Sequence, residues 1–484
     1  MSSTAVTTQS AAIPVDRILA PRAIAIVGAS ADPRSSGGFV LANLERFGFA
    51  GELHLVSRGS SEINGRPCVK RIDDLPAGID LAVLAIPEAG VLDAVRACGE
   101  RGVGAVVIFA SGYAESGEDG RIKQEALVAA AHAAGVRIVG PNCMGFTNLA
   151  AGIPVTFEPE LVPYPGNGQA GVGVVAQSGA MAANLRDALV SRGLPVSIVA
   201  STGNEASLGI EDYLAHFVAS AQVRVMAVYA EQIRRPALFL QLARAAREAG
   251  KPIVLLMPGR SQRARQAAQS HTGALAGDHA LASALLRAQA VVMVNALDEL
   301  FDVVAVLARF PAPPAGGPAV VTGSGAVKNL ALDFADDIGL ALPELAHDTV
   351  ERLSALLPAY AVAENPLDYT TISMRNPGIV GELVDAMLAD DNVGSAVLTL
   401  VAGPPMAQRD KAEHMVPALA RAAKPTALVV MGDGIALEPY FQDAIRASGV
   451  PFFRSLDRAL RALAHVAAYG QALQRAARAG ARPA

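Results

Sequence analysis

Short apolar runs recur along the whole chain, separated by alanine-rich stretches with helical spacing. Residues 23–28 read AIAIVG, residues 171–177 read GVGVVAQ, and residues 318–323 read PAVVTG. Apolar and polar positions do not alternate within these runs, so we expect both faces of each strand to be buried. Parallel sheets covered by helices have this property. The pattern predicts an α/β protein with three consecutive doubly wound (Rossmann-/flavodoxin-like) domains and mainly parallel sheets.

Two stretches rich in proline and glycine are interpreted as linkers, residues 152–171 and 309–319. A chain of 484 residues is long enough for two to four domains. The linkers therefore predict three domains of similar size after a flexible tail. The expected boundaries are 1–13 for the tail and 14–150, 151–310 and 311–484 for the domains.

A strand running into a glycine turn and then a helix occurs three times, once near the start of each predicted domain. Backbone N–H groups at such a helix N-terminus bind phosphate well. Close packing of helix on strand would also explain the glycines, but three such turns favour anion sites. The predicted phosphate-binding residues in the second and third turns are Gln177, Ser178, Gly179, Ala180, Gly323, Ser324 and Gly325.

Composition excludes several classes of protein. The chain is 52% hydrophobic and 18% charged, with 40 basic and 45 acidic residues, and no basic cluster with aromatics suggests a nucleic acid partner. Three scattered cysteines predict neither disulfides nor a metal site and favour a reducing environment. Neither a signal peptide nor a membrane span is evident, so we expect a cytoplasmic protein without membrane attachment.

The first predicted domain lacks the nicotinamide-dinucleotide fingerprint. The turn after the first strand, Gly28 to Pro33, breaks the G-x-G-x-x-G spacing, and the second strand ends in Ser57 and Arg58 instead of an acid. An arginine there suits the ribose phosphate that NADP and coenzyme A both carry. The other predicted cofactor-binding residues follow the strands at the same edge: Ala29, Ser30, Ile86, Pro87, Ser111, Gly112, Asn142 and Cys143. Cys143 is interpreted as structural rather than nucleophilic.

Six segments in this order resemble the NDP-forming acyl-CoA synthetases, the superfamily of succinyl-CoA synthetase and ADP-forming acetyl-CoA synthetase. They read VGAS, GPNCMGFTN, AQSGA, STGNEA, SHTGALAG and ENPLDYT. The resemblance implies that residues 14–150 bind coenzyme A. It also implies that 151–310 form a succinyl-CoA synthetase-like flavodoxin-type domain with a phosphohistidine loop, and 311–484 a second flavodoxin-type domain.

In that family the histidine of the SHTGA-like segment is phosphorylated during turnover, and His271 matches it. A neutral imidazole nitrogen can attack a phosphoryl group, and small neighbours leave room for the donor. Glu231, at the end of a predicted strand, matches the family's glutamate partner of the histidine. Glu205 is the rival candidate, with a helix N-cap as its structural interpretation. We prefer Glu231.

The resemblance implies an ADP-forming acyl-CoA synthetase that works through an acyl phosphate and phosphohistidine. Because three Rossmann-like units use up the chain, the ATP-grasp module that binds ATP or ADP with Mg is expected on a separate β-type subunit, in a hetero-oligomer. Ser57-Arg58 replace the usual Asn-Pro pair, Met257 stands where a lysine is common, and the third turn has fewer glycines than usual.

Two alternatives remain open from the sequence. The first is a non-catalytic CoA- or acyl-CoA-binding regulatory protein, which would need neither His271 nor Glu231. The second is an NADP-dependent oxidoreductase, which we rank last. The acyl group is not readable from the sequence, since small acids are the family default and aryl acids stay open.

Overall fold

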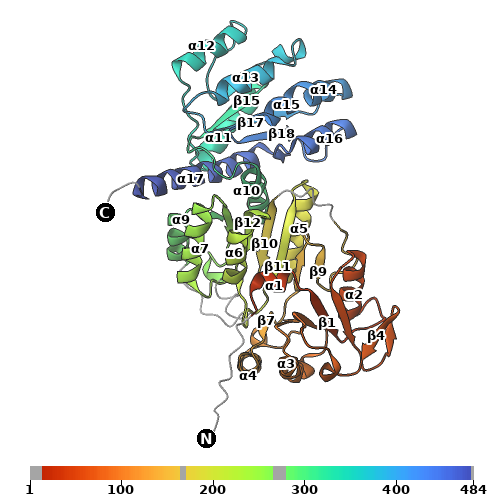
Figure 1. Cartoon of the computed structure of the whole chain (residues 1–484). Helices are drawn as coiled ribbons and strands as arrows, with labels where there is room; N and C mark the ends of the chain where they lie inside the picture. The colour runs from red at the N-terminus through yellow and green to blue at the C-terminus, as the bar shows by residue number, and fades with distance from the viewer. Residues whose placement is uncertain (1–12, 164–169, 265–278, 481–484) are drawn as a thin grey trace. The chain divides into compact units, whose positions relative to one another are not determined.

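Three β-sheets follow one another along the chain (Figure 1). The computed structural model describes residues 13–163, 170–264 and 279–480. Most strand pairs in the described residues are parallel, and the antiparallel pairs are β3–β4, β8–β9 and β8–β11. The fold class predicted from the apolar runs is confirmed.

The first sheet has the strand order β3-β4-β2-β1-β5-β6-β7. The central strands β1, β5 and β6 are buried at every position, as their unbroken apolar sequences require. The strands are β1 (Ala23–Val27), β2 (Glu52–Val56), β3 (Glu62–Ile63), β4 (Arg66–Val69), β5 (Leu81–Leu84), β6 (Ala105–Ile108) and β7 (Arg137–Val139). The helices are α1 (Val15–Leu19), α2 (Ser36–Arg46), α3 (Val91–Glu100) and α4 (Glu118–Ala134).

The second sheet has the order β14-β13-β12-β10-β11-β8-β9. Its strands are β8 (Phe146–Asn148), β9 (Ile153–Val155), β10 (Gly171–Ala176), β11 (Val196–Ser201), β12 (Val223–Tyr229), β13 (Ile253–Leu256) and β14 (Val292–Val294). The accompanying helices are α5 (Gly179–Ser191), α6 (Ile210–Ala219), α7 (Pro236–Glu248), α9 (His279–Ala288) and α10 (Leu297–Arg309).

The third sheet, β16-β15-β17-β18-β19, is parallel throughout. Its strands are β15 (Pro318–Thr322), β16 (Leu367–Asp368), β17 (Ser395–Val401), β18 (Thr426–Met431) and β19 (Phe452–Phe453). The helices are α11 (Gly325–Asp337), α12 (His347–Leu356), α13 (Ile379–Leu388), α14 (Pro405–Asp410), α15 (Val416–Ala420), α16 (Pro439–Ser448) and α17 (Leu456–Gly480).

The same strand order recurs in all three sheets. Apart from extra edge strands, the first strand of each parallel set lies between the second and the third: β2-β1-β5, β11-β10-β12 and β16-β15-β17. The three glycine turns of the sequence directly follow β1, β10 and β15. Each turn therefore lies where the strand order reverses, the position at which doubly wound sheets bind ligands.

The prolines and glycines of residues 152–171 predict a linker, but part of this stretch is a strand. Ile153–Val155 form β9, which pairs antiparallel with β8 and is buried. Pro154 is tolerated because β9 is the last strand of its sheet, where a missing N–H disrupts no ladder.

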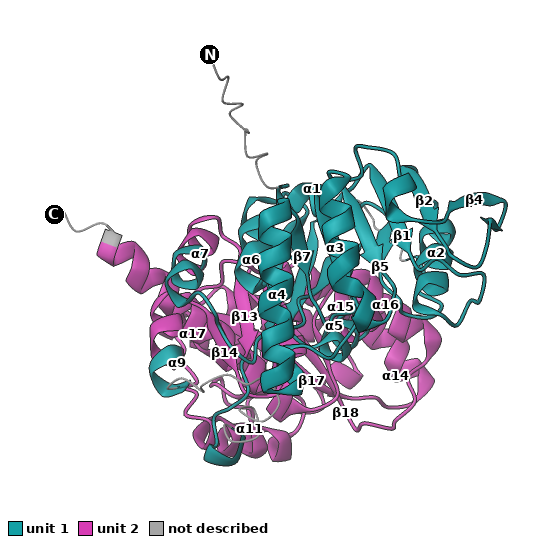
Figure 2. Cartoon of the chain, turned by 90° about the horizontal axis from the view of Figure 1, so that it is seen from below, with its two compact units in different colours: residues 1–187, 195–242, 257–282 teal, residues 188–194, 243–256, 283–484 magenta. Residues whose placement is uncertain are grey.

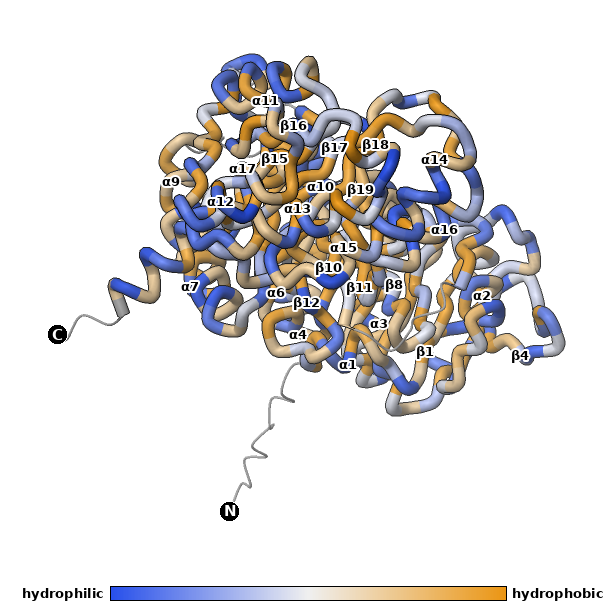
Figure 3. The backbone as a smooth tube through the Cα atoms, turned by 90° about the horizontal axis from the view of Figure 1, so that it is seen from above, coloured by the Kyte–Doolittle hydropathy of each residue, from blue (hydrophilic) through white to orange (hydrophobic). Residues whose placement is uncertain are grey.

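The described residues divide into two compact units, coloured in Figure 2. Unit 1 comprises residues 1–187, 195–242 and 257–282, and unit 2 comprises 188–194, 243–256 and 283–484. Hydrophobic residues follow the strands of both units, while hydrophilic residues dominate the outer turns (Figure 3). The division into three domains, with boundaries at 150 and 310, stays a prediction.

Candidate active site

The exits of β10 and β12 are joined by one side chain of unit 1. The Gln177 side chain Oε1 accepts hydrogen bonds from the backbone N–H of Glu231 at 2.6 Å and of Gln232 at 3.0 Å. Its Nε2 donates to the Gln232 carbonyl at 2.7 Å. Three hydrogen bonds thus fix the backbone of Glu231 beside the turn that opens α5. Two of the predicted residues, far apart in sequence, are brought together.

Ser178 makes the N-terminal contacts of α5. Its Oγ accepts from the Met181 N–H at 3.4 Å and its carbonyl from the Ala182 N–H at 3.0 Å. Gly179 has no room for a side chain, because a Cβ there would lie 2.5 Å from Cγ of Met144. The turn is therefore held tightly against the GPNCMG segment, with the helix N-terminus at the reversal of strand order.

The two candidate glutamates differ in what surrounds them. The Glu205 side chain is only 1% exposed, and its Oε1 accepts from Thr202 Oγ1 at 2.9 Å and from the Ile210 N–H at 3.0 Å. Ile210 is the first residue of α6 and Gly209 is its N-cap, so Glu205 accepts from the helix N-terminus without being the N-cap residue itself. The half-buried Glu231 carboxylate has no hydrogen-bond or ion-pair partner among the described residues.

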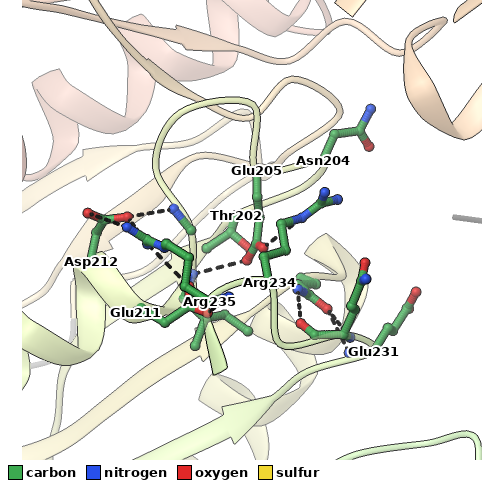
Figure 4. A network of polar contacts seen from close by, with 12 residues as sticks. Thr202, Asn204, Glu205, Glu211, Asp212, Glu231, Arg234 and Arg235 are labelled. Atoms are coloured by element: carbon green, nitrogen blue, oxygen red, sulfur yellow. Dashed lines mark hydrogen bonds and ion pairs between the residues drawn. The ribbon is translucent and has the colours of Figure 1, made fainter. Parts of the chain in front are cut away.

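Glu205 is also paired with an arginine that the sequence analysis did not single out. Arg234 Nε donates to Glu205 Oε2 at 3.1 Å, and 41% of the Arg234 side chain remains exposed (Figure 4). Burial raises the pKa of Glu205, and the nearby charge of Arg234 opposes that rise. An exposed guanidinium three residues after Glu231 places positive charge at this edge.

The neighbouring Arg235 clamps the segment after β12 to the start of α6. Its backbone N–H donates to Glu211 Oε1 at 2.9 Å, and its guanidinium pairs with Glu211 at 3.2 Å and with Asp212. Asp212 in turn pairs with Arg137 of β7 at 3.2 Å. Figure 4 shows these ion pairs on one side of the loop and Glu231 on the other. The clamp fixes the backbone that carries Glu231 and Arg234.

The Gly28 turn lies at the reversal between β1 and β5. Gly28 has φ +91°, and a Cβ there would lie 2.3 Å from the Ala85 carbonyl oxygen and 2.9 Å from Cγ2 of Ile86. The turn therefore packs directly on the loop carrying Ile86 and Pro87. Ser30 Oγ accepts from the Asp32 N–H at 3.1 Å. Ala29 is buried, while Ser30 is half-buried and Pro33 exposed, which leaves polar groups of this turn accessible to a ligand.

A second cation lies beside Arg58 after β2. Ser57 is buried, Arg58 is exposed, and Lys70 Nζ donates to the carbonyls of Ser60 at 2.8 Å and of Arg58 at 3.4 Å. Lys70 follows β4, a short strand whose sequence RPCV has no apolar pattern, so sequence reasoning missed it. Two positive side chains here fit a phosphate better than the single arginine predicted.

The loops after β6 and β7 meet the STGNEA segment. Asn142, with φ +55°, donates from its side chain to Asn204 Oδ1 at 3.3 Å. Asn204 Nδ2 also contacts Glu115 Oε2 and lies 3.0 Å from Gln124 Oε1. Gly112, at φ +102°, donates its N–H to Glu115 Oε1 at 2.6 Å, and Ser111 before it is exposed. The motif glycines and asparagines thus link the carboxyl edges of the first and second sheets.

Cys143 is structural in its contacts. Its thiol is buried and lies 3.5 Å from the Ile108 carbonyl oxygen and 3.7 Å from that of Val139. Burial raises the pKa of Cys143 to about 12, so the thiolate that a nucleophile needs is scarce at neutral pH. Cofactor binding by Cys143 stays a prediction, and these contacts do not favour it.

Comparisons with known proteins show the family to which the chain belongs. Residues 22–148 match the CoA binding domain family, and residues 169–307 match the succinyl-CoA ligase like flavodoxin domain family. The α subunit of acetate–CoA ligase [ADP-forming] I of Pyrococcus furiosus is 30% identical over 93% of this chain and 96% of its own. The α subunit of isoenzyme II is 33% identical over 73% and 76%. The chain belongs to the NDP-forming acyl-CoA synthetase superfamily.

Another superfamily member, trans-feruloyl-CoA synthase FCS1 from an unidentified prokaryote, is 40% identical over 94% of this chain, which spans 64% of that protein's length. A solved structure of Korarchaeum cryptofilum dinucleotide forming acetyl-coenzyme A synthetase 1 in complex with phosphate and ADP superposes with a TM-score of 0.84. It is 27% identical and covers 97% of this chain and 99% of its own. The resemblance drawn from six motifs is confirmed.

The third glycine turn of the chain lies in unit 2. Ser324 precedes α11, and a Cβ on Gly323 would lie 2.8 Å from Cε2 of Tyr369. The Asp368 carboxylate ends β16, with Oδ2 3.3 Å from where a Cβ of Gly325 would be. A carboxylate so close to the turn is unfavourable for an anion unless a cation accompanies it. Phosphate binding at this third turn stays a prediction.

His271 lies outside the described residues, so its geometry to Glu231 stays a prediction. In the described part of the chain, no cluster of histidine, cysteine or acidic residues could hold a metal ion, and no helix is long and apolar enough to cross a membrane.

Proposed function

We propose that this chain is the α-type subunit of an ADP-forming acyl-CoA synthetase. It interconverts acyl-CoA, ADP and phosphate with a carboxylic acid, CoA and ATP. The observation that carries the proposal is the junction of β10 and β12. There Gln177 holds Glu231 beside the Ser178 helix N-terminus, and the Glu231 carboxylate keeps no partner among the described residues. A carboxylate without a partner among the described residues, beside the proposed phosphate-binding turn, suits the orientation of a phosphorylated imidazole.

The reaction has three reversible steps. Phosphate attacks the thioester carbonyl, so the C–S bond breaks and CoA leaves with an acyl phosphate remaining. A neutral nitrogen of His271 then attacks phosphorus and releases the carboxylate. Finally ADP accepts the phosphoryl group from the histidine. The Ser178 turn and the Arg234 guanidinium supply preorganised positive charge to the phosphoryl oxygens, and Glu231 stabilises the charged imidazole.

Coenzyme A binds at the edge of the first sheet in this proposal. The Gly28 turn, the loop of Ile86 and Pro87, and Arg58 with Lys70 surround the reversal between β1 and β5. The match to the CoA binding domain family over residues 22–148 supports this assignment.

An aryl acid is the substrate class that a specific comparison favours over a small aliphatic acid. The feruloyl-CoA synthase is 40% identical, against 30% and 33% for the two acetate–CoA ligase α subunits. We therefore include feruloyl-CoA beside acetyl-CoA in the test.

The ATP-grasp module with its Mg-nucleotide is proposed to reside on a β-type partner subunit, as the α-subunit relatives suggest.

The test is the acyl-CoA half-reaction. The purified chain is incubated with radiolabelled inorganic phosphate and acetyl-, propionyl-, benzoyl- or feruloyl-CoA, and the protein is examined for acid-labile, base-stable label. We expect label in the wild type with one acyl class, none in His271→Asn, and at least tenfold less in Glu231→Gln. His279→Asn is the matched control histidine and should keep the label.

If no acyl-CoA labels the wild type or any variant, two explanations remain. A second experiment distinguishes them. If an added ATP-grasp subunit with labelled ATP restores label on His271, the half-reaction depends on the partner. If CoA binds but neither arm labels the chain, the catalytic proposal fails and the non-catalytic CoA-binding regulator takes its place.

A further inference from the structure

Two phenylalanines of unit 1 contact each other outside the residues described so far. Phe109 directly follows β6, and Phe157 lies two residues after β9. Their ring centroids are 4.8 Å apart at an interplanar angle of 70°, an edge-to-face arrangement. Both residues are half-buried, so part of their apolar surface stays uncovered. That surface is available to a further aromatic ring, which packs on such edges and faces with a specific geometry.

The pair lies where the carboxyl edges of the first two sheets meet. Phe109 leaves the carboxyl end of β6, two residues before Ser111 of the proposed CoA edge. β9 is antiparallel to β8, and β8 is antiparallel to β11, so β9 has the same direction as β11 and β10. The C-terminal end of β9 is therefore at the edge that carries the Ser178 turn. Phe157 comes from this phosphate edge and Phe109 from the CoA edge.

Motif residues connect the aromatic pair to the phosphate turn. A Cβ on Gly145 would lie 3.2 Å from Cε1 of Phe109, so the ring packs directly on the GPNCMG segment. The half-buried Met144 precedes that glycine and covers Gly179, the first residue of α5, with its Cγ 2.5 Å from where a Cβ would be. Apolar side chains thus extend from the N-terminus of α5 to Phe109 and, through the ring contact, to Phe157.

The backbone on both sides of Phe157 is held in place. Asn43 Nδ2 of α2 donates to the carbonyls of Thr156 at 3.2 Å and Glu158 at 2.8 Å. The Glu158 carboxylate pairs with Arg186 of α5 at 2.7 Å, and both of these side chains are largely buried. The phenylalanine is therefore fixed before a ligand arrives, which lowers the entropic cost of binding.

We propose that Phe109, Phe157 and Met144 contact the acyl group of the bound CoA thioester and select an aryl acyl group. This inference rests on the proposed function, in which phosphate at the Ser178 turn attacks the thioester of CoA bound along the first sheet. The acyl group must then lie between the two edges, where the aromatic pair is. An aryl group buries more apolar surface against the rings and the thioether than an acetyl group does, so these contacts discriminate between the two.

The test compares the affinities of CoA thioesters for the full-length chain. CoA, acetyl-CoA, hexanoyl-CoA, benzoyl-CoA and feruloyl-CoA are titrated calorimetrically. The wild type should bind the two aryl thioesters at least tenfold more tightly than acetyl-CoA and about threefold more tightly than hexanoyl-CoA, which is apolar without a ring. In Phe109→Leu/Phe157→Leu the preference for aryl over acetyl should fall below about threefold, with the affinity for CoA itself changed less than twofold.

Leucine keeps an apolar side chain at both positions, so the double variant should fold, and thermal unfolding checks this. Phe452→Leu is the matched control, because it removes a half-buried ring from β19 of unit 2 and should keep the aryl preference. An aryl preference that persists in the folded double variant would overturn the proposal. So would equal wild-type affinities for benzoyl- and hexanoyl-CoA, a comparison that needs no variant.

The titrations need no phosphoryl transfer, so they separate this proposal from the proposed function. An aryl preference that depends on the two phenylalanines supports the proposal even if His271 takes no label, and only the catalytic steps would then be contradicted. Absence of binding by CoA itself would overturn the CoA site of the proposed function and the acyl contacts together.

Discussion

Single residues at the carboxyl ends of strands supply most of the chemistry in the proposed function. Gln177 uses both ends of its amide to place the Glu231 backbone, so a residue predicted only as part of a phosphate turn has a second role. The Glu205 carboxylate, in contrast, accepts hydrogen bonds from Thr202, from the first residue of α6 and from Arg234. These contacts support Glu231 as the glutamate left for His271.

Gly28→Ala tests the first glycine turn. The added Cβ meets the Ala85 carbonyl and forces a positive φ on alanine, so we expect CoA affinity to fall at least tenfold and the free energy of unfolding by roughly 2–3 kcal/mol. Gly48→Ala is the control, since it also has a positive φ but a Cβ there meets nothing within 4 Å. Calorimetric CoA titration and urea unfolding measure both. Equal CoA affinity in the two variants would refute the assignment.

Between elements, the segment from Thr202 to Ala206 ties two sheets together. Backbone N–H groups of Asn204 and Ala206 donate to the carbonyls of Pro141 at 2.9 Å and Gly140 at 2.9 Å. The Asn204 side chain reaches Glu115 and Gln124 after β6. These five residues therefore connect the proposed CoA-binding edge with the proposed phosphohistidine edge within unit 1.

Asn204→Ala tests this link through pH. Burial alone would raise the pKa of Glu115, but hydrogen bonds from Asn204 and from the backbone of Gly112 and Tyr113 bring it below its ordinary value. A lowered carboxylate pKa stabilises the fold above the unfolded value and loses that effect as pH falls through the folded one. The variant should therefore lose roughly 1–2 kcal/mol of unfolding free energy at pH 7, with the deficit narrowing below about pH 4.

Urea unfolding from pH 3.5 to 8 measures that deficit. Gln124→Ala removes another Asn204 partner without touching Glu115, so its own deficit should not vary with pH. A deficit for Asn204→Ala that stays constant across the same range would contradict the role assigned to Glu115.

At the scale of the whole molecule, each compact unit consists of several separate stretches of chain, whereas the linkers predict domains that are continuous in sequence. Unit 2 takes in residues 188–194 and 243–256 as well as everything from 283 onward. Within unit 2, α10 buries eight consecutive residues, Leu300 to Leu307, and packs along α17 (Figure 1). The last helix therefore covers an element that the predicted boundary at 310 assigns to the preceding domain.

Truncation tests this arrangement. A fragment of residues 14–310 lacks α17 and exposes the apolar face of α10, so we expect it to aggregate or to lose cooperative unfolding. A fragment of residues 14–484 removes only the tail and should unfold like the full chain. Size-exclusion chromatography and thermal circular dichroism compare the two. A monodisperse, cooperatively folded 14–310 fragment would show that residues 14–310 fold on their own.

The sequence by itself determined the α/β class, the three strand–glycine–helix restarts and the superfamily, because apolar runs buried on both faces and glycine turns are local signals. It also led to Glu231 and Gly28 through motif order. Tertiary structure alone revealed Lys70 beside Arg58, Arg234 on Glu205, the Gln177 bond to Glu231 and the Asp368 carboxylate at the third turn. Each of these depends on which strands become neighbours. That choice is set by packing between segments tens of residues apart, which no local pattern encodes.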